Sequence, residues 1–303
     1  MDDRFDRRLG LTATYEREDA GVGRFLDPYF GGGVFRVDYA RALADDVIAP
    51  FKIAFVPVRF SPRERLRYDK YDKRASRYRR KLVWDYGLTE EPFGEFMGEV
   101  NRLALGGEGE ATGLARGYLN AFSKRRQTLA GAKGKFARVG DLSAAVRKAD
   151  RSILFAQTKE AAAEAVALLA GCGVNGAVLT SSMDMSERKE GFAAFEDGDH
   201  ELVAAPRLLD EGVDVPAADL AIVLASSRSR RQMVQRMGRV VRKKQDGRLA
   251  RLVIMYVMDS SEDPEVAHED FLYLVTEVSR DIVHFGPKAT PEQICDYLND
   301  WRP

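Results

Sequence analysis

The chain has few of the residues that build disulfide frameworks or metal clusters. Its 303 residues include two cysteines and three histidines. Cys172 and Cys295 lie far apart, and the histidines show no ligand spacing, so neither a disulfide framework nor a zinc cluster is supported. No apolar run approaches the roughly 18 residues of a membrane-spanning helix, and the first residues show no signal-peptide pattern. We therefore expect a cytoplasmic protein with no metal site and no membrane partner.

A phosphate-binding loop is also missing from these residues. The stretch G-A-K-G-K-F at 131–136 is superficially similar to one. The pattern G-x-x-x-x-G-K-[ST] would require glycine at 129 and serine or threonine at 136, where the chain has Leu129 and Phe136. No acidic pair of the D-E-x-H or D-E-A-D kind follows an apolar strand. The half of an ATP site that cradles phosphates and binds metal is therefore absent from this sequence.

Net charge does not indicate a partner, because Lys+Arg and Asp+Glu each number 47. The distribution of charge is more informative. Residues 59–81 contain eleven basic and three acidic side chains, whereas residues 259–303 contain three basic and eleven acidic ones. The first segment predicts a basic surface for a polyanion. The alternative is a set of solvated helix faces that only keep the chain soluble.

Short apolar runs bounded by turn residues alternate with segments of helical pattern. Such runs are typical of buried strands in a parallel sheet, and the alternation favours an α/β fold with helices on both faces of the sheet. Residues 87–112 show no clear pattern, and 265–303 are predicted to be helical. We predict strands at 51–58, 153–156, 174–179, 202–205, 220–224 and 252–257, and helices at 39–46, 62–84, 114–129, 159–170 and 186–195.

The stretch 201–244 contains the clearest functional pattern. Two of the predicted strands enclose a polar loop, D-E-G-V-D-V-P at 210–216. After the second strand, arginines at 236, 239 and 242 recur every third residue, which places them on roughly one helix face. Ligands of open α/β sheets bind at the strand ends, so cations gathered there predict an anionic ligand, with phosphate the leading candidate.

Four segments resemble conserved motifs of the superfamily 2 helicases, and they follow one another along the chain in the order found in that family. Q-R-M-G-R-V-V-R at 235–242 resembles motif VI, and D-E-G-V-D-V-P at 210–216 resembles motif V. I-L-F-A-Q-T at 153–158 resembles motif IV, and L-T-A-T at 11–14 resembles motif III. The chain is most similar to the DNA helicases of the xeroderma pigmentosum group B type and their bacterial relatives.

The resemblance implies a composite ATP site. Arg239 and Arg242, with Gln235 alongside, would be the catalytic arginine side of that site, and Gly212 and Asp214 would lie near the nucleotide. A basic surface helix and an ordinary turn are the structural alternatives. ATP and Mg²⁺ would be needed, but only together with an N-terminal half that supplies the phosphate loop. Such a half could be a separate partner chain.

The nucleic-acid side rests on hydroxyl groups and basic residues. Thr158, Thr180 and Ser181 lie at strand-to-helix junctions, where a hydroxyl and free amides suit a phosphate, although a plain helix cap would look the same. The basic helix occupies the place of a thumb-like insertion in the resembled family. Its arginines would contact phosphates and its tyrosines would either stack on bases or pack inward. The arginines in question are Arg74, Arg77, Arg79 and Arg80.

The expected organisation follows from the resemblance. Residues 1–49 would be a remnant of a first RecA-like domain, in which Thr12 and Thr14 of motif III couple nucleotide state to strand movement. Residues 50–303 would form the second RecA-like domain, with a helical insertion at about 61–145 and a helical tail at about 262–303. The chain would act on single-stranded or forked DNA as the C-terminal half of an ATP-dependent helicase or translocase. The alternative is a non-catalytic nucleic-acid-binding module derived from a helicase.

Overall fold

The computed structural model describes residues 8–10, 21–32, 35, 37, 39–180, 182–205, 218–224, 247–266 and 279–300. The chain divides into two compact units. One contains residues 1–36 and 62–128, and its helices from 62 onward are called the helical module here. The other contains residues 37–61 and 129–303 and is called the sheet unit. No helix in the described ranges is both long and apolar enough to cross a membrane.

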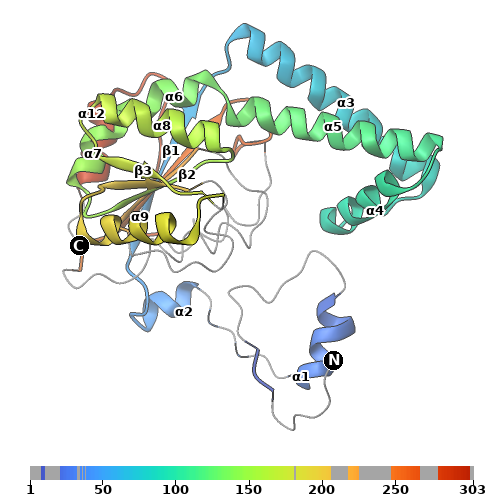
Figure 1. The fold of residues 1–303 in the computed structure, drawn as a ribbon, viewed down its shortest axis with the longest axis horizontal. Helices are drawn as coiled ribbons and strands as arrows, with labels where there is room; N and C mark the ends of the chain where they lie inside the picture. The colour runs from blue at the N-terminus through green and yellow to red at the C-terminus, as the bar shows by residue number, and fades with distance from the viewer. Residues whose placement is uncertain are drawn as a thin grey trace. The chain divides into compact units, whose positions relative to one another are not determined.

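The sheet unit is built on a parallel sheet, seven of whose strands fall in the described ranges (Figure 1). The strand order is β3-β4-β2-β5-β6-β1-β7, and each neighbouring pair is parallel. This confirms the α/β prediction. The strands are β1 (Phe51–Val58), β2 (Ser152–Phe155), β3 (Gly176–Val178), β4 (Leu202–Ala204), β5 (Leu220–Val223), β6 (Ala250–Val257) and β7 (Asp281–His284).

Alternate residues of the central strands enter two separate cores, one on each face of the sheet. On β1, Phe51, Ile53 and Phe55 enter one core, and Ala54 and Val56 enter the other. Every residue of β1 and β6 is buried, because helices or loops cover both faces of a parallel sheet. The largely apolar sequences of these strands are a direct consequence.

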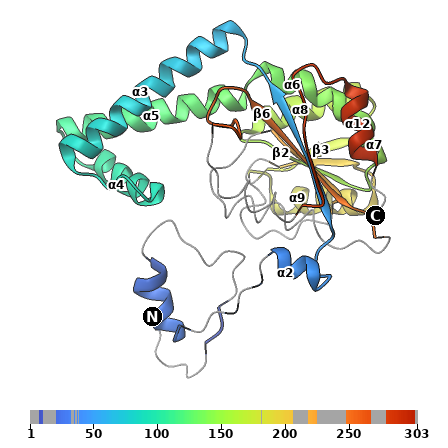
Figure 2. The same cartoon turned by 180° about the vertical axis from the view of Figure 1, so that it is seen from behind.

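Helices cover both faces, as Figures 1 and 2 show. On one face, buried alanines and Leu169 of α8 pack against the strands, together with Ile294, Cys295 and Leu298 of α12. On the other, Phe192 and Phe195 of α9 enter the core. The helices that fall in the described part of this unit are α2 (Tyr39–Ala44), α6 (Lys133–Val139), α7 (Ser143–Lys148), α8 (Lys159–Gly171), α9 (Met185–Asp197) and α12 (Pro291–Asn299), with a 3-10 turn at Gly140–Leu142.

The prediction that residues 265–303 are helical is wrong at β7. Asp281–His284 pairs in parallel with β1 at the edge of the sheet, and both of its end residues are exposed. An edge strand with one short apolar pair lacks the continuous apolar run of a central strand. Its conformation depends on pairing with a distant strand, which local sequence does not reveal.

A buried ion pair closes the amino-terminal edge of the sheet. The Asp219 carboxylate lies 2.5 Å from the Arg251 guanidinium, and both side chains are almost fully buried. Asp219 also accepts hydrogen bonds from the backbone amides of Asp150 and Arg151, at 3.0 and 3.2 Å. Burial lowers the pKa of Arg251, and the charge of Asp219 opposes that effect. This pair joins the starts of β2, β5 and β6.

The helical module consists of α3 (Pro62–Tyr86), α4 (Phe93–Leu105) and α5 (Glu110–Ala130), the last two residues of α5 belonging to the sheet unit. Proline at the first position of α3 fits a helix start. Tyr68, Ala75 and Leu82 are buried at intervals of seven along α3. Phe96 and Val100 of α4 meet Ala75 and Leu82 in one small core. Helix α4 was not predicted from the sequence, because its glycines and mixed pattern obscure the helical period.

Residues 129–145 lie within the insertion expected at about 61–145, but in the structure they belong to the sheet unit. Helices α6 and α7 bury Phe136, Val139 and Val146 against the sheet.

In the N-terminal segment, the short helix α1 (Asp27–Phe30) ends at Gly31, whose φ of 74° suits glycine. Arg8 donates to the Tyr29 carbonyl at 3.1 Å. The assignment of residues 1–49 to a first RecA-like domain stays a prediction.

Candidate functional site

The carboxyl ends of the strands bring distant segments to one edge of the sheet. Because the described strands are parallel, the residues that follow each of them emerge at the same edge. Thr158 follows β2 and Thr180 follows β3. The segment that begins at 206 follows β4, and the segment that begins at 225 follows β5. This is the edge at which open α/β sheets bind ligands, and we call it the carboxyl edge.

Many of the predicted site residues lie outside the part of the chain that the structure describes. Ala205 after β4 and Leu224 after β5 are the last described residues before the segments of motifs V and VI, and the side chains of these segments are not described. The residues concerned are Gln235, Arg239 and Arg242 of motif VI, Gly212 and Asp214 of motif V, Ser181, and Thr12 and Thr14 of motif III.

Thr158 caps helix α8. Its Oγ1 accepts a hydrogen bond from the Ala161 amide at 3.1 Å. The Glu160 carboxylate lies in the same turn, and hydrogen bonds from its own backbone amide and from the Thr158 hydroxyl lower its pKa. The structure thus shows the capping role of Thr158. The phosphate contact of its hydroxyl stays a prediction.

A cluster of hydroxyls and one lysine joins the β2–α8 and β3–α9 connections. The Lys159 Nζ donates to Ser182 Oγ at 2.5 Å. Ser182 Oγ lies 2.9 Å from Thr180 Oγ1. Lys159 is exposed, whereas Thr180 is 8% exposed. The sequence reasoning missed Lys159, although its place directly after Thr158 at a strand-to-helix junction could have indicated it.

The buried Lys135 lies beside the point where the motif VI segment begins. Its Nζ donates to the Leu224 carbonyl at 2.5 Å and to Glu262 Oε2 at 2.6 Å. The Lys135 side chain is fully buried and that of Glu262 is 6% exposed. A Cβ on Gly134 would lie 2.8 Å from the Arg59 carbonyl, so the glycine allows α6 to approach the end of β1 closely. The stretch 131–136, which is superficially similar to a phosphate loop, therefore serves to pack α6 against the sheet.

The four arginines predicted on α3 differ in their surroundings. Arg74 is exposed and has no hydrogen-bond or ion-pair partner among the described residues. Arg77 and Arg80 are exposed and lie over neighbouring rings, 5.5 Å from the Tyr78 centroid and 5.8 Å from that of Trp84. Arg79 instead points within the module.

The Arg79 guanidinium is held by the connection between α3 and α4. It donates to the Glu90 carbonyl at 2.8 Å and to Glu91 Oε1 at 3.0 Å. It also lies 5.3 Å from the Phe96 ring centroid. Arg79 is therefore engaged in contacts within the module. Of the four arginines, the other three are available to an external anion.

The chain is similar to helicases in sequence. Residues 134–244 match the family model of the helicase conserved C-terminal domain. The DNA 3'-5' translocase XPB2 of Sulfurisphaera tokodaii is 30% identical over 237 residues, which are 78% of this chain and 50% of that protein. The UvrABC system protein B of Fusobacterium nucleatum is 27% identical over 158 residues, which are 50% of this chain and 23% of that protein. The chain therefore spans half or less of the length of these relatives.

Solved structures align with this chain at lower sequence identity. The C-terminal part of the Fun30 ATPase domain aligns with a TM-score of 0.45 at 11% identity, covering 84% of this chain and 96% of that chain. The helicase domain of Hef from Pyrococcus furiosus aligns with a TM-score of 0.44 at 17% identity, covering 72% of this chain and 58% of that chain.

Proposed function

Because the chain belongs to the superfamily 2 helicases through its helicase C-terminal domain, we propose that it works as the C-terminal half of an ATP-dependent DNA helicase or translocase. The observation that carries this proposal is the carboxyl edge. There the parallel sheet gathers the ends of β2, β3, β4 and β5. In the sequence, motif IV lies at the end of β2, and the segments of motifs V and VI follow β4 and β5. A nucleotide and a nucleic-acid strand would both be served from this edge.

The nucleotide side of the proposal rests on topology and on donor chemistry. Strands β4 and β5, which precede the segments of motifs V and VI in the chain, both end at an edge that suits an anionic ligand. Guanidinium groups at Arg239 and Arg242 fit a polyphosphate, since arginine binds phosphate oxygens in a fixed bidentate geometry. Backbone at Gly212 and the carboxylate of Asp214 would hold the remainder of the nucleotide. ATP would supply the free energy of phosphoryl transfer, and the arginines would stabilise the charge that develops in the transition state.

Lys135 and Glu262 would act behind the nucleotide site. Lys135, which is paired with Glu262, donates to the carbonyl of Leu224, the last described residue before the segment that leads to motif VI. Gln235 would complete the catalytic set. The phosphate loop and the acidic residues that bind Mg²⁺ would come from a RecA-like domain that these 303 residues do not contain.

The nucleic-acid side would use both units. At the carboxyl edge, Lys159 with the hydroxyls of Thr180 and Ser182 offers one cation and two small donors to a phosphate. On the helical module, Arg74, Arg77 and Arg80 offer exposed positive charge. Single-stranded or forked DNA is the proposed partner, as expected for a relative of a DNA translocase.

Reconstitution tests this proposal. We expect no DNA-stimulated ATPase from the 303-residue chain alone, and stimulated turnover once a matching N-terminal half with a phosphate loop is added. The measurement is phosphate release with and without single-stranded DNA. ATPase activity of the isolated chain would contradict the assignment of the missing parts. DNA binding without any turnover in the mixture would instead favour a non-catalytic nucleic-acid-binding module.

A further inference from the structure

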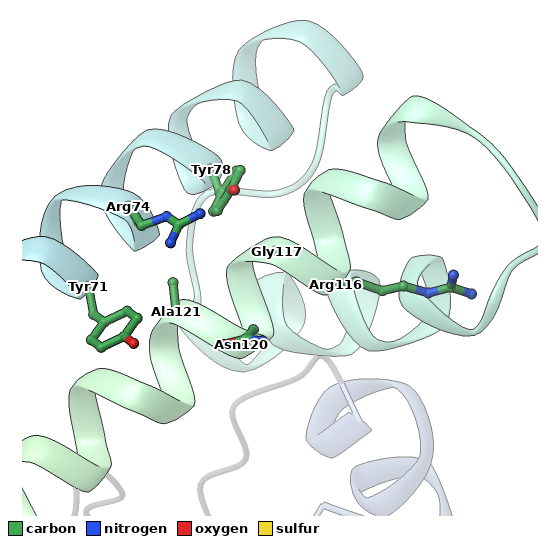
Figure 3. Close-up of a pocket in the computed structure, with 7 residues that line it drawn as sticks. All are labelled: Tyr71, Arg74, Tyr78, Arg116, Gly117, Asn120 and Ala121. Carbon is green, nitrogen blue, oxygen red and sulfur yellow. The ribbon is translucent and has the colours of Figure 1, made fainter.

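A cavity lies between α3 and α5 in the helical module (Figure 3). Its volume is about 270 Å³. Helix α3 lines it with Tyr71, Arg74 and Tyr78, which share one face because they are three and four residues apart. Helix α5 lines it with Gly117, Asn120 and Ala121, so every wall comes from the same small unit.

Gly117 forms the floor under the Tyr78 ring. A Cβ at position 117 would lie 2.9 Å from Tyr78 Cζ, closer than real side chains approach. The glycine therefore lets the ring lie directly against the backbone of α5. Tyr71 and Tyr78 remain half-buried, whereas Tyr68 on the same helix is 4% exposed and belongs to the protein interior. The helix thus has one tyrosine that packs inward and two that face the cavity.

The cavity has polar groups that the protein itself does not use. The Tyr71 and Tyr78 hydroxyls, the Arg74 guanidinium and the Asn120 carboxamide have no hydrogen-bond partners among the described residues. Asp72, next to Tyr71, is already paired with Arg125 at 2.6 Å. Positive charge at the cavity is therefore not cancelled by this neighbouring acid.

Arg116, which also borders the cavity, is directed away from it in Figure 3. Its guanidinium donates to the Ala104 carbonyl at 2.9 Å and to the Gly106 carbonyl at 3.2 Å. These bonds satisfy the end of α4. The only guanidinium that the cavity can offer to a ligand in the described module is that of Arg74.

We propose that this cavity binds one unstacked base of a single-stranded nucleic acid. The inference rests on the proposed function and extends it to a base-binding site. A cavity of this size lies below the roughly 300 to 1,000 Å³ of sites for drug-sized ligands and suits one flat ring system. The tyrosine rings provide surfaces for stacking, and Asn120 can both donate to and accept from a base edge. Arg74 contacts the flanking phosphate. A base inside a duplex is stacked on both sides and does not enter.

The test compares two single-stranded DNA probes of equal length, an oligodeoxyadenylate and the same oligonucleotide with abasic sites at its centre. The full chain is expected to bind the first about tenfold more tightly, the scale of one stacked base. Gly117→Ala and Tyr78→Leu should abolish this preference and leave the affinity for the abasic probe unchanged. Tyr78→Phe should retain the preference.

Gly113→Ala is the matched control. It makes the same change on α5, where an added Cβ meets no atom within 4 Å. Because alanine is the better helix former, neither glycine variant should lose helicity, which circular dichroism checks. A preference retained in both Gly117→Ala and Tyr78→Leu would place the base elsewhere and overturn the proposal. Salt-dependent binding with equal affinity for both probes would overturn it and leave the proposed function standing. Failure to bind either probe would overturn both.

Discussion

In the sheet unit two buried cations are paired with buried acids, whereas in the helical module the cations of α3 lie mostly on the surface. Lys135 is bound to Glu262 and Arg251 to Asp219, and all four side chains are nearly inaccessible to water. On α3, by contrast, Arg74 has no partner among the described residues, and its exposed neighbours contact only rings.

This difference separates structural charges from charges that can bind a ligand. Burying a cation without a partner is strongly unfavourable. Each acid of these pairs therefore compensates the buried charge of its own cation. An exposed arginine costs little to leave unpaired and remains free to release counterions from a polyanion. The basic composition of residues 59–81 therefore overstates the charge available to a ligand, because Arg79 is held within the module.

The largest expected effect concerns the motif VI arginines at the carboxyl edge. In the enzyme reconstituted with its N-terminal half, Arg239→Ala or Arg242→Ala should lower ATP turnover on the order of 10³-fold, because a transition-state arginine is lost. DNA affinity should change little, since the helical module is intact. Turnover and DNA affinity are measured on the same preparations. Wild-type turnover in both variants would remove the catalytic assignment.

Breaking a buried pair should be the next largest effect. Asp219→Asn leaves Arg251 buried with a neutral partner and should lower the free energy of unfolding by about 3 to 5 kcal/mol. The control is Asp69→Asn on α3, whose carboxylate lies 3.7 Å from Arg65 at a partly exposed site. That change should cost about 1 kcal/mol or less. Chemical denaturation measures both, and equal losses would contradict the contrast between the two units.

Neutralising the exposed arginines should alter binding rather than folding. Replacing Arg74, Arg77 and Arg80 together by glutamine should reduce the slope of log affinity against log salt concentration by about two, at roughly 0.7 per phosphate contact on a single strand. Arg79→Gln should leave the slope unchanged and reduce stability. Fluorescence anisotropy with single-stranded DNA at several salt concentrations gives the slopes. An unchanged slope in the triple variant would assign α3 to packing or protein contacts.

The smallest effect tests the burial of Tyr256 on β6. Burial, with the nearby carboxylates of Asp263 and Glu265, raises the pKa of Tyr256 to about 12. The phenol of the unfolded chain ionises near pH 10. Since the folded pKa is the higher one, this contribution is complete below pH 10 and is lost as pH rises toward 12. The loss should be about 2 kcal/mol. Tyr256→Phe should flatten the alkaline part of the stability profile, and an unaltered profile would contradict the burial.

Much of the sheet unit follows from local sequence. Strands buried on both faces are largely apolar, so β1 and β6 were recognisable from their side chains, although Lys52 and Arg251 near their starts are charged. The resemblance of four segments to helicase motifs likewise indicated a helicase C-terminal domain, since each motif is a short run of adjacent residues. The helix α3 was equally clear, because proline at its start and a long run of helix formers are local signals.

The tertiary structure alone decided the remaining features. Edge strand β7 depends on its pairing with β1. The bond from Lys135 to Glu262 joins residues 127 positions apart. Which tyrosines of α3 are buried, and which face a cavity, depends on where α4 and α5 lie against it. Local sequence specifies elements whose character comes from their own side chains, whereas pairing, burial and cavities arise only where distant parts of the chain meet.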